Sequence, residues 1–133
     1  MSSITATAVW PVLTFRDALA EMAFLHDAFG LEETTVITGE ADPSIIERGD
    51  MRWPSGPGIM FCSAGRDDSL RTRRPGNEAI YLVSDDPDRL FATATSAGAE
   101  VVHRLRDEGF GSRGFTLRDP EGVLWSFGTY DGE

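Results

Sequence analysis

The sequence contains few side chains of the types that carry out catalysis or bind metals. It has one cysteine, Cys62, and two histidines, His26 and His103. A cysteine becomes a nucleophile when a base lies beside it, and the sequence supplies no histidine close to Cys62. We therefore interpret Cys62 as a buried strand residue. His26 lies one position away from the apolar stripe of a predicted helix, which is typical of a residue at the edge of the buried face.

The composition excludes several classes of protein. The chain has 22 acidic and 12 basic residues and a net charge of −10, which argues against nucleic-acid binding because phosphate contacts require a basic face. The sequence shows no apolar run near 18 residues and no basic N-terminal segment, so we expect neither a membrane span nor a signal peptide. A single cysteine excludes an internal disulfide and is typical of a reducing cytoplasm.

The hydrophobic pattern predicts two similar series of helices and strands. Asp17 is expected to cap a helix that runs to Phe29, and Pro87 to open a second helix that Gly98 closes. Alternating and β-branched segments predict the strands. They fall within residues 8–15, 34–38, 44–53 and 59–63 of the first half, and within 78–83, 100–105 and the hairpin 109–130 of the second.

The two series repeat one another. The same thirteen-residue spacing separates Asp17 from Gly30 and Asp85 from Gly98, which predicts two βαβββ modules. Neither module could bury its helix and its sheet alone, so we expect an α+β fold in which both modules form one curved, cleft-bearing mixed sheet with the helices outside. The whole chain, 1–133, is predicted as a single domain. Its parts are a first module over about 6–64, a linker over about 65–77 and a second module over about 78–131.

Several segments resemble a known family. They are Pro-Val-Leu-Thr-Phe-Arg-Asp at 11–17, Ala-Phe-Gly-Leu at 28–31, Gly-Ser-Arg at 111–113 and Asp-Pro-Glu-Gly-Val-Leu-Trp at 119–125. With them the chain resembles the vicinal oxygen chelate, or glyoxalase/bleomycin resistance/dioxygenase, superfamily over nearly all of its length. Within that superfamily it is most similar to small bacterial PhnB-like proteins.

The resemblance implies a divalent metal held by histidine and carboxylate ligands from four strands. The corresponding positions here are occupied by Trp10, Met60, Glu78 and Ser126. Glu78 is the one strong ligand among them, and one carboxylate does not hold a catalytic metal. We therefore predict no metal, no other cofactor and no catalytic residue. The alternative is a divalent-metal-dependent lyase, isomerase or dioxygenase of the same superfamily.

The residues that replace the metal ligands predict a binding cleft. Trp10, Val12, Met60 and Ile80 would form an apolar, partly aromatic floor, with Glu78 as its charge. Such a floor could bind a small aromatic or cationic organic molecule through apolar area, cation–π attraction and the carboxylate. The resemblance suggests antibiotic sequestration as one such function. The other interpretation is that these side chains simply fill the core, with Glu78 at its wet edge.

Two further residues and a partner complete the expected site. Ser126 lies in the final strand, and Arg113 stands just before the final hairpin, where it either meets an anionic group of the ligand or packs at the surface. The resemblance also implies a homodimer. The apolar run 79–83 gives an independent reason, because an exposed strand without a charged side chain is normally paired or covered.

Overall fold

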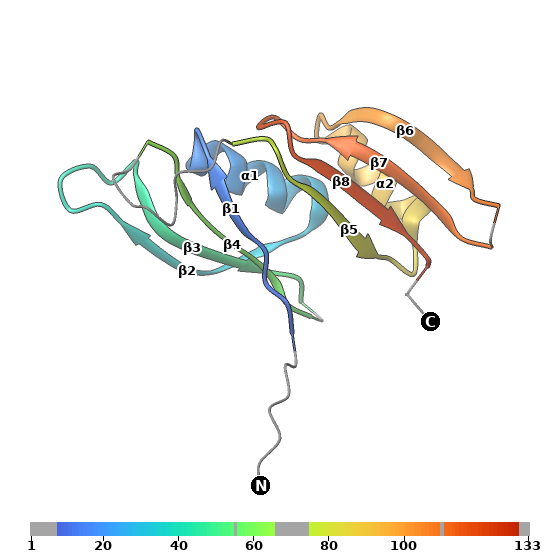
Figure 1. Ribbon diagram of the computed structural model, residues 1–133, viewed down its shortest axis with the longest axis horizontal. Helices are drawn as coiled ribbons and strands as arrows, with labels where there is room; N and C mark the ends of the chain where they lie inside the picture. The colour runs from blue at the N-terminus through green and yellow to red at the C-terminus, as the bar shows by residue number, and fades with distance from the viewer. Residues whose placement is uncertain (1–7, 55, 66–74, 110, 131–133) are drawn as a thin grey trace, which may run out of the picture.

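The protein is built from one layer of strands and one layer of helices. The computed structural model describes residues 8–54, 56–65, 75–109 and 111–130. Two four-stranded mixed sheets form the first layer, and both helices lie against the same side of it (Figure 1). Among the described residues, no helix covers the other side of the sheets, which we call the open face. The α+β class and the two predicted βαβββ modules are confirmed.

The first module contains four strands and one helix. In chain order they are β1 (Val12–Phe15), α1 (Ala18–Phe29), β2 (Glu32–Thr38), β3 (Ile46–Arg52) and β4 (Gly58–Ser63). The strand order across the sheet is β1-β4-β3-β2, and β1 runs parallel to β4. The parallel pair is possible because the helix and two strands between β1 and β4 return the chain to the start of the sheet.

The second module repeats this arrangement. Its elements are β5 (Ala79–Val83), α2 (Pro87–Ser96), β6 (Glu100–Asp107), β7 (Arg113–Arg118) and β8 (Leu124–Gly128). The strand order is β5-β8-β7-β6, with β5 parallel to β8. The internal repeat in the sequence therefore corresponds to two modules of the same topology.

Three details differ from the sequence-based expectation. Hydrogen-bonded ladders join strands only within each module of the described chain, so the eight strands form two sheets instead of one. Helix α2 ends at Ser96 with Ala97 as its cap, two residues before Gly98. Residues 6–7 and most of the predicted linker, 66–74, lie outside the described residues.

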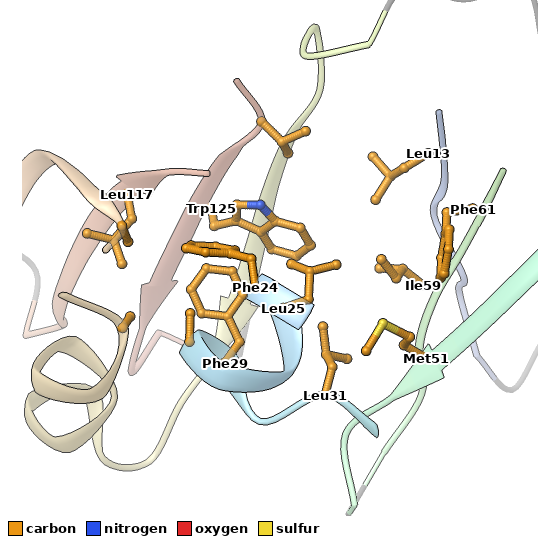
Figure 2. Close-up of a cluster of buried hydrophobic side chains, with 14 of the residues drawn as sticks. Leu13, Phe24, Leu25, Phe29, Leu31, Met51, Ile59, Phe61, Leu117 and Trp125 are labelled. Atoms are coloured by element: carbon orange, nitrogen blue, oxygen red, sulfur yellow. The ribbon is translucent and has the colours of Figure 1, made fainter. Parts of the chain in front are cut away.

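Helix α1 forms the centre of the hydrophobic core because it contacts both sheets. Phe24 and Phe29 point toward Trp125 of β8, while Leu25 lies between that group and the apolar side chains of the first sheet (Figure 2). The ring of Phe29 lies 5.1 Å from that of Trp125 and 5.0 Å from that of Phe127, measured between centroids. A helix of the first module thus completes the core of the second.

The turn between β7 and β8 fixes the start of α1 from across the chain. The Glu121 carboxylate accepts hydrogen bonds from the backbone N–H groups of Arg16 and Asp17, both at 2.8 Å. In return, the guanidinium of Arg16 donates to the backbone carbonyl of Glu121 at 3.1 Å. Free N–H groups at a helix N-terminus attract negative charge, so a buried carboxylate is well placed there.

The same turn is held by a second buried carboxylate. One oxygen of Asp119 accepts from the backbone N–H groups of Glu121 and Val123, at 2.8 and 3.0 Å. The other oxygen accepts from the indole Nε1 of Trp125 at 2.8 Å. Both carboxylate oxygens of Asp119 therefore accept hydrogen bonds inside the protein, which offsets the cost of burying the charge.

Glu21 of α1 is buried beside these two carboxylates. It is 1% exposed, and neither of its carboxyl oxygens has a hydrogen-bond partner of good geometry among the described residues. Burial raises the pKa of the Glu21 carboxyl to about 10, and the carboxylates of Asp119 and Glu121 act in the same direction. Glu21 is therefore protonated at neutral pH, and as an acid it can donate to Asp119.

Glu21→Gln is expected to stabilise the protein at neutral and alkaline pH. The unfolded chain loses the Glu21 proton above pH 4.5, whereas the folded protein keeps it up to about pH 10. Between these two pH values, the free energy of unfolding of the wild type falls by about 1.4 kcal/mol per pH unit. The glutamine has no proton to lose. Denaturant unfolding should show the variant about 3 kcal/mol more stable at pH 7 and equal to the wild type near pH 4. A stability difference that does not change with pH would contradict the assignment.

Candidate functional site

A large cavity lies between the two modules, on the side of the helices. Its volume is about 1190 Å³. Four parts of the first module reach it: the chain before β1, the end of α1, the β3–β4 turn and the start of β4. The second module contributes β5, the loop after it, the first turns of α2 and Phe127 of β8. We call this space the inter-module cavity.

Apolar and aromatic side chains dominate the wall of the inter-module cavity. Phe29, Trp53 and Phe127 supply aromatic surface, and Ile80 and Leu82 of β5 supply aliphatic surface. Trp53 is held in place because its indole Nε1 donates to the backbone carbonyl of Phe29 at 3.1 Å. A cavity with such walls binds organic molecules mainly through the removal of apolar surface from water.

Charged groups lie in the part of the cavity wall that joins β5 to α2. Asp85, Asp86 and Arg89 all line this part. Asp86 also caps α2, because its carboxylate accepts from the backbone N–H of Arg89 at 3.2 Å. The cavity thus combines an apolar body with a charged border.

Three of the predicted site residues lie together on the open face of the first sheet. Val12 of β1 is paired with Met60 of β4, and their neighbours Leu13 and Phe61 point to the core. Trp10 precedes β1 and lies on the same face, since the Arg52 guanidinium is 5.8 Å from its ring centroid. That distance allows a cation–π contact. The predicted aromatic floor therefore exists in part, but it lies outside the inter-module cavity.

Ser126 lies on the open face of the second sheet. It is paired with Tyr81 of β5 and with Thr116 of β7, and its hydroxyl lies 2.7 Å from that of Thr116. The Tyr81 hydroxyl donates to the backbone carbonyl of Tyr130 at 2.7 Å. The result is a small polar group of hydroxyls next to β5.

Ile80 and Glu78 are placed differently from the expectation. Ile80 is paired with Trp125, whose side chain is buried under the helices, so Ile80 lies on the opposite face from Val12 and Met60 and lines the inter-module cavity. Glu78 directly precedes β5 and is half-buried. Its Oε1 atom has no hydrogen-bond partner among the described residues.

Arg113 is held by two carboxylates. Its guanidinium donates to both oxygens of Asp88 on α2, at 2.8 and 3.1 Å, and to Asp107 on β6 at 3.2 Å. The hydrogen bonds from Arg113 lower the pKa of the Asp88 carboxyl, and the pKa of Arg113 is correspondingly raised. This geometry ties α2 to the sheet and favours the packing interpretation of Arg113 over the ligand-binding one.

The positions at which the resemblance places metal ligands do not fit a divalent ion here. Trp10 offers no lone pair, Met60 offers a soft thioether, and the Ser126 hydroxyl is engaged with Thr116. In the described part of the chain, no three His, Cys, Asp or Glu side chains gather as a metal site would require. Glu78 alone supplies a carboxylate donor, so no catalytic step is assigned to a metal.

The sequence did not single out most of the cavity residues. Phe29 belongs to the buried stripe of α1, and an aromatic residue in such a stripe gives no sign that it also lines a cavity. Trp53 follows a strand, and Asp85 and Asp86 stand in the usual position of a helix cap. No local signal in the sequence therefore indicated this site.

Comparison with known proteins agrees with this architecture. Residues 7–127 match the model of the Glyoxalase/Bleomycin resistance protein/Dioxygenase superfamily, and the chain belongs to that superfamily. No curated protein sequence matches the chain significantly. None of the described helices has the length and apolar character needed to cross a membrane.

Solved structures with the same fold include proteins of known resistance function. TioX from Micromonospora sp. ML1 has a TM-score of 0.74 and 24% identity, over 91% of this chain and 98% of TioX. A bleomycin resistance determinant encoded on transposon Tn5 has a TM-score of 0.69 and 18% identity, over 95% and 99%. The fosfomycin resistance protein FosX from Listeria monocytogenes has a TM-score of 0.65 and 18% identity, over 97% of both chains.

Arg113→Gln is expected to lower the melting temperature slightly, since α2 loses its ion pairs with the sheet. The lowered pKa of Asp88 means that this stabilisation is present above the ordinary carboxyl pKa and is lost as the pH falls through the lowered value. Thermal unfolding should show a lower melting temperature for the variant than for the wild type at pH 7, and a smaller difference between the two at pH 2.5. Arg118→Gln is the control, because Arg118 makes a single longer contact to Glu100, at 3.5 Å, and should change stability less.

Proposed function

We propose that this protein binds a small organic molecule in the inter-module cavity, without using a metal. The observation that carries the proposal is the cavity itself, whose aromatic and aliphatic walls come from both modules. Its volume of about 1190 Å³ is slightly larger than the roughly 300–1,000 Å³ typical of small-molecule sites. A cavity of this size accepts a flat aromatic ring system with substituents.

Sequestration of an antibiotic is the biological role that we propose for this binding. The fold is shared with a bleomycin resistance determinant, and a protein that only binds its ligand needs no catalytic group. The residues present support this proposal, since the superfamily's metal positions hold Trp10, Met60, Glu78 and Ser126, of which only Glu78 is a strong metal ligand. Binding lowers the free concentration of the toxic compound in proportion to the amount of protein.

Ligand screening tests the proposal. Thermal shift with bleomycin, fosfomycin and a panel of planar aromatic antibiotics should identify compounds that raise the melting temperature, because a ligand that binds only the folded state stabilises it. Isothermal titration calorimetry then gives the stoichiometry and affinity. A panel in which no compound changes the melting temperature or releases heat would count against the proposal.

Ile80→Trp is expected to weaken the binding of any ligand found in this way by more than tenfold. The added ring would occupy the wall of the cavity, where Ile80 is half-buried, and would displace the ligand. Val101→Trp is the matched control, since Val101 is 40% exposed on β6 and does not line the cavity. Calorimetry on both variants measures the effect, and equal loss of affinity in the two would place the ligand elsewhere.

We also propose that the protein forms a homodimer through the open face. Val12, Tyr81 and Val83 are large apolar side chains on that face, and they are 38%, 49% and 58% exposed. Covering them with the same surface of a second chain would remove apolar area from water and give a two-fold interface. The predicted residues Trp10, Val12, Met60 and Ser126 would then lie at or beside this interface.

Light scattering during size-exclusion chromatography tests the dimer. The expected mass is about twice the 14.5 kDa of one chain. Val83→Glu places a charge on the open face and should shift the protein toward the monomer, while Val101→Glu on β6 should not. A mass of 14.5 kDa that does not change with concentration would contradict the dimer.

A further inference from the structure

The charged groups around the inter-module cavity indicate which sign of charge a ligand should have. Among the described residues that line the cavity, Asp85 and Asp86 are acidic and Arg89 is basic. If Arg89 is balanced by one carboxylate, one negative charge remains. The end of α1 adds to it, because Ala28, Phe29 and Gly30 line the same cavity and the C-terminus of a helix carries partial negative charge.

Asp85 is the carboxylate best placed to meet a ligand. Asp86 is engaged as the cap of α2, whereas Asp85 has no hydrogen-bond or ion-pair partner within the described part of the chain. Asp85 is exposed at the border of the cavity, so it would attract a cationic group with the strength of a surface ion pair. Trp53 is half-buried and lines the cavity, and its aromatic ring adds attraction for a cation.

We infer that the inter-module cavity is selective for organic cations that combine an aromatic body with an ammonium or similar group. This inference rests on the proposed small-molecule function and names the class of ligand. The aromatic body would lie against Phe29, Trp53 and Phe127, and the cationic group would lie near Asp85 and the end of α1. Arg89 opposes the cation, so its removal should increase affinity.

Three probes that share one aromatic body and differ in charge separate the possibilities. They are the cation 2-naphthylmethylammonium, the neutral 2-naphthalenemethanol and the anion 2-naphthoate. Isothermal titration calorimetry with the full chain at low salt should show the cation binding most tightly. Its affinity should fall as salt is added, while the affinity of the neutral probe should not.

Single substitutions then assign the charge recognition to residues. Asp85→Asn should weaken the cation about fivefold and leave the neutral probe unchanged, whereas Arg89→Gln should strengthen the cation by a similar factor. Glu40→Gln is the control for net charge, because Glu40 is exposed and does not line the cavity. Ile80→Trp should abolish binding of the cation if the site is the inter-module cavity.

The outcomes distinguish the inference from the function on which it rests. If the naphthoate binds most tightly and Arg89→Gln abolishes its binding, the cavity recognises an anion, and the inference is wrong while the binding function stands. Equal affinity for all three probes would mean that the cavity does not select by charge, so the inference would be wrong while the binding function stands. Cation binding that survives in Ile80→Trp would place the cation site elsewhere and overturn the inference. If none of the three probes binds, the inference is wrong, while the proposed binding function is decided separately by the antibiotic panel.

Discussion

The position of α1 between the two sheets is the constraint on which the rest of the structure depends. Its two phenylalanines pack against β8, its Leu25 faces the apolar side chains of the first sheet, and its N-terminus is held by Glu121 from the turn between β7 and β8. Burial of each large side chain contributes about 2–3 kcal/mol, so the packing of this one helix decides how the modules are arranged. The inter-module cavity lies where the C-terminal end of α1 reaches the second module.

Much of the fold could be predicted because its signals are local and repeated. Asp17 and Gly30 mark the ends of α1, short apolar runs mark β4 and β5, and alternating residues mark β8. The equal spacing in both halves then gave two modules of one topology. What the sequence could not provide is the relation between the modules. Whether β1 and β5 pair depends on packing between the modules, and in the described chain the two sheets share no ladder.

The candidate site was harder to predict for the same reason. The sequence correctly predicted that Val12 and Met60 lie on the same face of the first sheet. It could not show which residues of the second sheet lie on that face. Ile80 was expected there, but it faces the helices. The residues that line a cavity between modules follow the usual hydrophobic pattern of their own strand or helix, so the sequence does not mark them. Trp53 and Phe29 are examples, since each follows the ordinary pattern of its own strand or helix. The carboxylate of Glu21 was also missed, because it stands among the small residues of a helix that otherwise has a normal apolar stripe.

The shared core has a consequence for how the chain folds. The first module cannot complete the burial of Phe24 and Phe29 until β8 is in place, and Trp125 and Phe127 are covered only when α1 has formed. The hydrogen bonds of Glu121 close a loop of 105 residues, which is an entropically costly contact that forms late. The two halves, although each repeats the other's topology, therefore depend on one another and should gain and lose structure in a single cooperative transition. The two modules share one topology, and the aromatic contacts between them join the pair into a single folding unit.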